Sequence, residues 1–137
     1  MSVVIDASAT LGWIYLDEMT PLASQIFQRV ADFGAWVPSI WPVEVANGLQ
    51  MGVRRQRIGA AFRDAALADL AALNIAVDPS TGAMAWTTTL QLADRFGLTV
   101  YDAAYLELAQ RRALPLASLD APLCAAAREL GVPVVGD

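Results

Sequence analysis

The stretch Val3-Val4-Ile5-Asp6-Ala7-Ser8 decides how the chain begins to fold. Three consecutive β-branched residues, with no alternation of polar side chains, are typical of a strand buried on both faces of a sheet. Asp6 ends this strand, and residues 9–16 follow with a short helical pattern for which Ser8 is the expected N-cap. A buried strand that leads directly into a helix predicts a parallel sheet covered by helices, with Asp6 at its rim.

The same alternation of strand and helix runs through the rest of the chain. Thr20, Pro21 and Gly34 give a helix at 21–33 its N-cap, a proline at its first position and a glycine after its end. Further helices are expected at residues 42–55, 60–73, 81–96, 101–112 and 121–130, and further strands at 35–37, 74–77, 114–117 and 132–135. No repeat, linker or low-complexity segment interrupts the pattern, so we expect one α/β domain over residues 1–137.

The composition excludes several classes of protein and of catalytic site. Of the 137 residues, 56% are hydrophobic and 17% are charged, which excludes intrinsic disorder. Histidine and lysine are both absent, and all nine cationic residues are arginine. The chain therefore has no base for a Ser-His-Asp or Cys-His mechanism, no histidine ligand for zinc or haem, and no lysine for a P-loop or a Schiff base.

Charge and cysteine content indicate the surroundings in which the protein works. The single cysteine, Cys124, allows no intramolecular disulfide, and we expect a reducing cytoplasm. No apolar run approaches the ~20 residues that span a bilayer, and no signal peptide is evident, so we expect no membrane association. The formal charge of −5 disfavours RNA binding through bulk charge, but it leaves open RNA held by metal ions and a local group of arginines.

Four acidic residues fall where a parallel sheet of this kind binds its ligands, outside the carboxyl ends of the strands. Asp6 follows the first strand, and Glu44 lies in the first turn of the helix after the second strand. Asp102 begins the helix at 101–112, and Asp120 follows the strand at 114–117. We therefore expect the four carboxylates to gather at one rim of the sheet.

This set of acids, with no catalytic base or nucleophile beside it, is best suited to binding Mg²⁺ or Mn²⁺, which prefer oxygen ligands. Without a cation the carboxylates would repel one another, and their pKa values would rise. A bound cation grips a phosphodiester, acidifies a water and stabilises the charge at phosphorus, so the sequence predicts metal-dependent phosphodiester hydrolysis. Because a single acid at a strand end or helix start is usually a helix cap or a solvated residue, the hypothesis depends on the set and above all on Asp6.

Four segments resemble the motifs of the PIN-domain ribonucleases, and within them of the VapC toxins of toxin–antitoxin pairs. The segments are Val4-Ile5-Asp6-Ala7-Ser8, Pro42-Val43-Glu44-Val45-Ala46-Asn47-Gly48-Leu49, Tyr101-Asp102-Ala103-Ala104-Tyr105-Leu106-Glu107-Leu108-Ala109 and Ser118-Leu119-Asp120-Ala121-Pro122-Leu123. The third is the closest match, and in the fourth the family usually has threonine where this chain has Ser118. The four occur in the family's order and spacing and cover essentially the whole chain.

The resemblance implies a PIN-like three-layer fold, in which helices flank a five-stranded parallel sheet of order 3-2-1-4-5. It implies endoribonuclease activity with Mg²⁺ or Mn²⁺ held by Asp6, Glu44, Asp102 and Asp120, and it implies a cognate antitoxin as partner and a homodimer. We expect Asp6 and Asp102 to bind the cation directly, and Glu44 and Asp120 to do so directly or through water. Glu44 is the candidate for positioning or deprotonating the attacking water, and Ser118 for orienting Asp120 or a water.

Several polar residues near these motifs carry two interpretations each. Asn47 shares a helical face with Glu44, where it either bonds Glu44 or a phosphate or is merely structural. Three arginines lie close to the end of the same helix: Arg54, Arg55 and Arg57. They either contact RNA phosphates or complement the negative end of the helix dipole, and the dipole role is the favoured interpretation. Arg111 and Arg112 are interpreted in the same way.

Apolar residues near the first two motifs are candidates for a partner surface. Trp13 and Trp41 flank those motifs and are placed at the rim or in an antitoxin groove. Five further apolar residues either line an exposed groove that a partner helix could occupy or pack in the core: Leu11, Ile14, Tyr15, Leu22 and Ile26.

Two further classes of function stay open. The main alternative is a non-catalytic module on the same scaffold that binds RNA or a protein, which the presence of all four acids disfavours. A metal-dependent phosphatase or DNA nuclease is the third hypothesis. A phosphatase with an aspartyl nucleophile usually has an acid two residues after the first, and here that position is Ser8.

Overall fold

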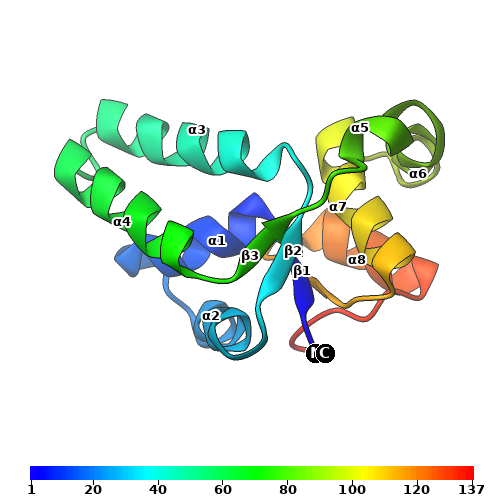
Figure 1. Cartoon of the computed structure of the whole chain (residues 1–137), viewed down its shortest axis with the longest axis horizontal. Helices are drawn as coiled ribbons and strands as arrows, with labels where there is room; N and C mark the ends of the chain where they lie inside the picture. Colours follow the sequence, from blue (N-terminus) through cyan, green and yellow to red (C-terminus); the bar gives the residue numbers. More distant parts are fainter.

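The computed structural model describes residues 1–137 and is an α/β fold with one parallel sheet (Figure 1). The sheet has four strands in the order β3-β2-β1-β4, and every pairing is parallel. The strands are β1 (Val3–Ile5), β2 (Ala35–Val37), β3 (Ile75–Val77) and β4 (Leu116–Ala117). The predicted alternation of strand and helix is confirmed.

The helices follow the predicted ranges closely, apart from a break in the fifth predicted one. They are α1 (Ala7–Ile14), the 3-10 turn η1 (Leu16–Glu18), α2 (Pro21–Phe33), α3 (Trp41–Arg54), α4 (Ala60–Ala72), α5 (Thr81–Met84), the π-helical segment η2 (Ala85–Thr89), α6 (Leu90–Phe96), α7 (Val100–Arg112) and α8 (Ala121–Leu130). The helix predicted over 81–96 therefore contains a π segment, which contains three consecutive β-branched threonines. None of these helices combines the length and the apolar character that a membrane-spanning segment requires.

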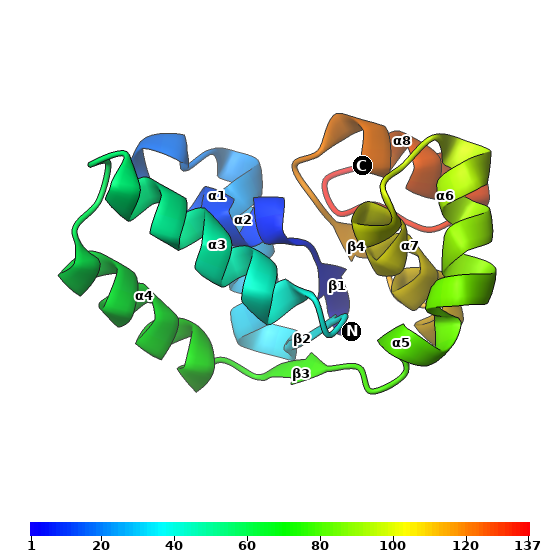
Figure 2. The same ribbon diagram turned by 90° about the horizontal axis from the view of Figure 1, so that it is seen from above.

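The helices form two layers, one on each side of the sheet. In both Figure 1 and Figure 2, α1 to α4 lie on one side and α5 to α8 on the other. The central strand β1 is completely buried, as its run of β-branched residues predicts, and one hydrophobic core extends across the sheet. The carboxyl end of β1 is therefore enclosed by helices from both layers.

The prediction of a fifth strand at 132–135 is wrong. Val134 forms only an isolated parallel bridge with Leu116, in the position beside β4 that the fifth strand would occupy. Pro133 has no N–H to donate to a ladder, and Gly136 turns the chain away with a φ of 102°. The neighbouring strand is also only two residues long, so little backbone is left to pair with.

The N-cap predicted for the first helix is also wrong. Asp6, rather than Ser8, caps α1, because its carboxylate accepts a hydrogen bond from the backbone N–H of Ala9 at 2.9 Å. The helix consequently begins at Ala7, two residues earlier than predicted. The strand and the helix thus meet at one side chain, that of Asp6.

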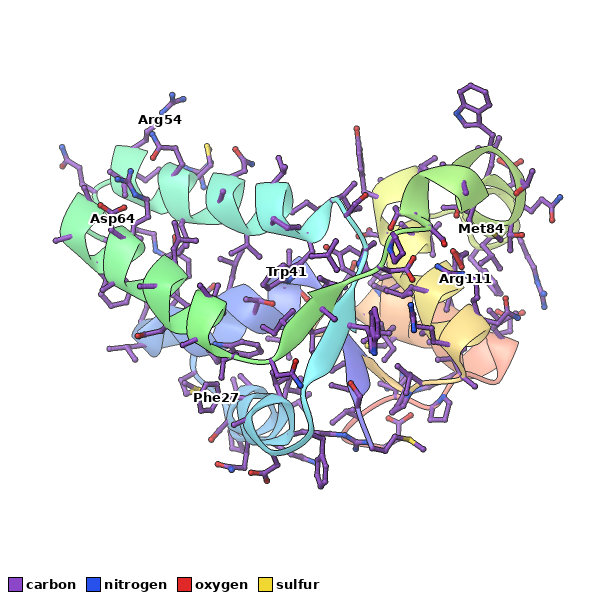
Figure 3. The ribbon with its side chains drawn as sticks, viewed as in Figure 1. Phe27, Trp41, Arg54, Asp64, Met84 and Arg111 are labelled. Carbon is purple, nitrogen blue, oxygen red and sulfur yellow. The ribbon has the colours of Figure 1, made fainter.

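A buried ion-pair cluster fastens the end of α7 to the edge of the sheet. Asp78 directly follows β3 and is fully buried. Arg111 donates to both of its carboxylate oxygens, at 3.1 and 2.7 Å, and Arg112 donates to Oδ1 at 3.1 and 2.9 Å. Arg111 also pairs with buried Glu107, and the guanidinium of Arg112 lies 3.4 Å from the centre of the Trp36 ring. Both arginines stand in the last turn of α7, as predicted, and Figure 3 places Arg111 beside the sheet.

We expect Asp78→Asn to lower the free energy of unfolding by about 3 kcal/mol, because two guanidinium groups would keep only part of their pairing. Hydrogen bonds from Arg111, followed by those from Arg112, hold the pKa of Asp78 at about 2, below its usual value of 3.8. The contribution of Asp78 is therefore complete above pH 4 and is lost as the pH falls toward 2.

Urea unfolding of both proteins at several pH values measures this difference. Asp64→Asn, which breaks an exposed pair with Arg63, is the matched control and should change stability by less than about 0.5 kcal/mol. An equally small effect of Asp78→Asn at pH 7 would contradict the assigned role of the cluster.

Candidate active site

The first predicted site residue, Asp6, is a buried carboxylate held by four hydrogen bonds. It is 4% exposed, at the junction of β1 and α1. Besides the N–H of Ala9, the Ser8 hydroxyl lies 2.8 and 2.9 Å from its two oxygens, and the Ser118 hydroxyl donates to Oδ2 at 2.5 Å. Burial raises the pKa of Asp6 to about 6, although the hydrogen bonds from Ser118, Ala9 and Ser8 oppose that increase.

Two serine hydroxyls connect Asp6 with the loop after β4. Ser118 is buried, and its hydroxyl accepts the backbone N–H of Asp120 at 3.0 Å while it donates to Asp6. The Ser8 hydroxyl accepts the N–H of Leu119 at 3.0 Å in the same way. The sequence assigned Ser8 only a capping role, although its position two residues after Asp6 on a helix start already placed its hydroxyl near that carboxylate.

Glu44 lies in the first turn of α3, where a tyrosine of the opposite layer holds it. The hydroxyl of Tyr105 donates to Glu44 Oε1 at 2.5 Å, and the Tyr105 ring is 1% exposed. Burial, followed by the hydrogen bond to Glu44, raises the pKa of Tyr105 well above its usual range. The sequence did not single out Tyr105, although it lies within the third motif, one helical turn after Asp102.

Asp102 lies in the first turn of α7, and Thr99 caps that helix by accepting the Asp102 N–H at 3.1 Å. Partial burial and the neighbouring charge of Asp120 raise the pKa of Asp102. The charge of Asp102 in turn contributes to the raised pKa of Asp6. Asp102 therefore repels both Asp6 and Asp120 through space.

The four acids do not form a ready-made metal cage. No group of three acidic side chains lies close enough together to hold a metal ion. Equally, none of the seven ion pairs involves any of the four, so no arginine neutralises them. The donor set consists of carboxylate and hydroxyl oxygens, which suits a hard divalent cation, but the side chains must move toward a shared ion.

The remaining predicted polar residues lie on α3 or just after it. Asn47 is exposed and makes no side-chain hydrogen bond, so it does not bond Glu44. Arg54 and Arg55 are exposed at the end of α3, whereas Arg57 pairs with Asp17 at 3.2 Å.

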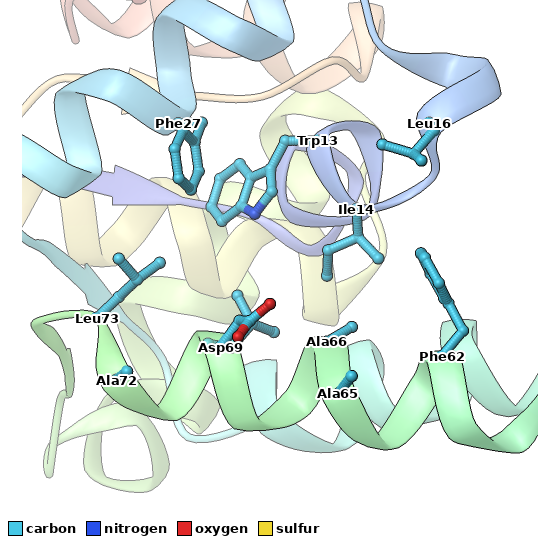
Figure 4. A pocket seen from close by; sticks show the side chains of 11 residues that line it. Trp13, Ile14, Leu16, Phe27, Phe62, Ala65, Ala66, Asp69, Ala72 and Leu73 are labelled. Carbon is cyan, nitrogen blue, oxygen red and sulfur yellow. The ribbon is translucent and has the colours of Figure 1, made fainter.

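An apolar groove is present, but of the five residues predicted to form one only Ile14 lines it, and the other four pack in or against the core. The apolar groove lies between α1, η1 and α2 on one side and α4 on the other, and it has a volume of about 420 Å³ (Figure 4). Trp13 and Ile14 line it as expected, together with Phe27 and Phe62. Ile26 and Tyr15 belong to the core, and Leu11 and Leu22 lie outside this groove. Trp41 is buried, with its indole N–H donating to Thr10 at 3.0 Å, so its placement at the rim is wrong.

The comparisons agree with this architecture. The model of the PIN domain family matches residues 3–129. The chain belongs to the PIN domain family. No curated protein matches the sequence.

Two solved structures have a similar fold to this PIN-domain chain. PAE2754 from Pyrobaculum aerophilum is 23% identical, with a TM-score of 0.68 over 92% of this chain and 86% of its own. The sarcin-ricin loop cleaving toxin VapC20 of Mycobacterium tuberculosis is 19% identical, with a TM-score of 0.63 over 91% of this chain and 95% of its own. At these identities the likeness concerns the fold.

We expect Asp6→Asn to stabilise the protein at pH 8, by on the order of 1–3 kcal/mol, because the substitution removes a buried charge. The amide retains an oxygen for the Ala9 N–H and offers donors to the two serine hydroxyls. Because the folded pKa of Asp6 is about 6 and its usual value is 3.8, the wild-type carboxyl takes up a proton below pH 6. The advantage of the variant should therefore shrink between pH 6 and 4.

Urea unfolding at pH 8 and at pH 4.5 measures both parts of this expectation. Asp94→Asn, at an exposed position without an ion pair, is the control and should show no such change with pH. An Asp6→Asn protein that is less stable than wild type at pH 8 would contradict the assignment of a costly buried charge.

Proposed function

We propose that this single-domain PIN protein is a Mg²⁺- or Mn²⁺-dependent endoribonuclease and the toxin of a toxin–antitoxin pair. The observation that carries the proposal is the set of acids without arginine partners at the carboxyl edge of the sheet, centred on buried Asp6. Membership of the PIN domain family and the likeness to a toxin that cleaves the sarcin-ricin loop support an RNA substrate.

In this proposal Asp6 and Asp102 hold the cation directly, and Glu44 and Asp120 complete its surroundings. When bound, the cation supplies positive charge that stabilises the transition state at phosphorus and increases the acidity of water. Burial, followed by repulsion from a neighbouring carboxylate, raises the pKa values of Asp6 and Asp102, and a bound cation would oppose both effects.

The chain's own residues hold these carboxylates in place. Ser8 and Ser118 fix both oxygens of Asp6, and Ser118 also fixes the backbone at Asp120. Tyr105 occupies Oε1 of Glu44, so Oε2 is left to accept a hydrogen bond or a proton from the attacking water. In the proposed reaction that water attacks phosphorus in line and a 3′ oxygen leaves.

A second candidate function has one observation in its favour. Because no three acids are close enough to hold an ion as they stand, a non-catalytic module that binds RNA or a protein would fit the same scaffold. The two candidates differ in whether RNA is cut and whether a chelator stops the cutting.

We expect total RNA to be cut in the presence of Mn²⁺ and to remain intact once EDTA is added. Asp6→Asn and Asp102→Asn should each lower the rate by about a hundredfold or more, because each removes a negatively charged oxygen ligand. Gel electrophoresis of the RNA measures the cutting, with Asp64→Asn as a control that should behave as wild type. Chelator-insensitive cutting, or full activity in folded Asp6→Asn protein, would contradict the proposal.

The antitoxin is expected to dock in the apolar groove, of whose eleven lining residues ten are hydrophobic. An apolar helix face suits such a groove, and the partly exposed Phe62 ring on α4 would lie in the contact. Undiminished binding of the cognate antitoxin by a folded Phe62→Glu protein would argue against this placement.

The homodimer and the cytoplasmic location stay predictions. Exposed apolar side chains on η2, α6 and α7 offer a face for a second copy: Trp86, which is 91% exposed, Leu90, Val100 and Tyr101. Light scattering of wild type and Trp86→Glu tests the dimer, and an unchanged mass would exclude this face.

A further inference from the structure

A second groove, polar in character, starts at the candidate active site and runs between α1 and α3. It has a volume of about 670 Å³, and only five of its fourteen lining residues are hydrophobic. Ser8 and Leu119 line one end, so this polar groove begins beside the carboxylate of Asp6 and the backbone of Asp120. A smaller share of its lining residues is hydrophobic than in the apolar groove on the other side of α1.

The far end of the polar groove is lined by two arginines. Arg55 makes no ion pair and no side-chain hydrogen bond, and Arg57 pairs only with exposed Asp17 and Glu18, at 3.2 and 3.7 Å. Exposed ion pairs of this kind exchange readily, because water screens them. Arg54 does not line the polar groove, and in Figure 3 its side chain extends away from the body of the protein.

The wall of the polar groove is rigid where the arginines lie. Tyr15 donates from its hydroxyl to the carbonyl of Gly48 at 3.0 Å. A Cβ atom at Gly52 would overlap the Tyr15 hydroxyl, so this glycine is what lets the tyrosine approach α3. The guanidinium of Arg57 lies 4.3 Å from the centre of the Tyr15 ring. A fixed aromatic ring thus orients one of the two cations.

We propose that the polar groove binds the RNA strand next to the scissile phosphate, with Arg55 and Arg57 contacting a backbone phosphate. This inference rests on the proposed endoribonuclease function. From Glu44 to Arg55 the axis of α3 rises about 16 Å, which places the arginines a short run of nucleotides away from the acids. Arginine binds phosphate through paired, charge-assisted hydrogen bonds. Asp17 and Glu18 hold Arg57 until a phosphate replaces them.

The polar lining favours RNA over a polypeptide as the occupant. A partner helix requires an apolar surface, and the apolar groove supplies one, whereas the polar groove carries unpaired Arg55 and ends at Ser8, whose hydroxyl donates to Asp6. Asp17 and Glu18 compete with a phosphate for Arg57. Neutralising them should strengthen RNA binding, which a purely structural ion pair would not do.

The test measures binding of a fluorescent single-stranded RNA by anisotropy, with Asp6→Asn protein so that the RNA stays intact. Adding Arg55→Ala and Arg57→Ala together should weaken binding at least tenfold and lower the slope of log affinity against log salt by about 1. Adding Asp17→Asn and Glu18→Gln together should tighten binding several-fold. Arg95→Ala removes an exposed arginine from the last turn of α6 and should leave affinity within about twofold.

The outcomes separate this inference from the proposed function. If Arg55→Ala with Arg57→Ala binds RNA as tightly as Arg95→Ala does, or if no RNA binding is measurable, the inference is overturned. It is also overturned if the double variant loses only the binding of a partner polypeptide. Chelator-sensitive cutting of RNA by the otherwise wild-type protein is judged separately, so the nuclease proposal can survive the loss of the groove.

Discussion

The arrangement of the candidate site depends on one buried carboxylate, that of Asp6. It ends the central strand, caps the first helix and accepts hydrogen bonds from Ser8 on α1 and from Ser118 in the loop after β4. Those bonds reduce the cost of burying a charge without removing it, because the pKa of Asp6 stays raised at about 6. A group of this kind is stabilised further by anything that brings positive charge to the edge of the sheet.

The protein distributes its arginines so that this edge keeps its negative charge. The buried acids Asp78 and Glu107 form ion pairs with Arg111 and Arg112. Arg57, Arg63 and Arg128 pair with exposed acids elsewhere. The four acids at the carboxyl edge pair with no arginine. The ion pairs of Asp78 with Arg111 and Arg112 fix the end of α7 against the strand β3. The same helix bears Asp102 and Tyr105, which lie at the candidate site. Stability and the proposed chemistry thus draw on different acids of the same chain.

Much of the fold follows from local sequence patterns. Thr20, Pro21 and Gly34 mark the bounds of α2 correctly, and the β-branched run Val3–Ile5 forms the buried strand at the centre of the sheet. The fifth strand does not form, because the apolar run at 132–135 includes Pro133, which has no N–H to donate, and because the neighbouring strand β4 is only two residues long. Whether residues 132–135 form a strand is therefore decided by their backbone pairing with β4 and not by their local sequence.

The places of the four candidate acids along the strands and helices can be predicted from the sequence, whereas the groups that contact those acids cannot. Asp6, Glu44, Asp102 and Asp120 can be located because each follows a strand or starts a helix. Tyr105 and Ser8 touch those acids only after the chain has folded, and their contacts join the two layers or two distant loops. The distance between the carboxylates is likewise a tertiary property, and no three of them stand ready around an ion.

The most direct test of the central claim is a crystal structure of the protein grown with Mn²⁺, with anomalous scattering used to locate the ion. The account predicts an anomalous peak bound by carboxylate oxygens of Asp6 and Asp102, with Glu44 and Asp120 moved toward it. A structure at saturating Mn²⁺ with no peak at this edge, or with peaks only at exposed acids elsewhere, would contradict it.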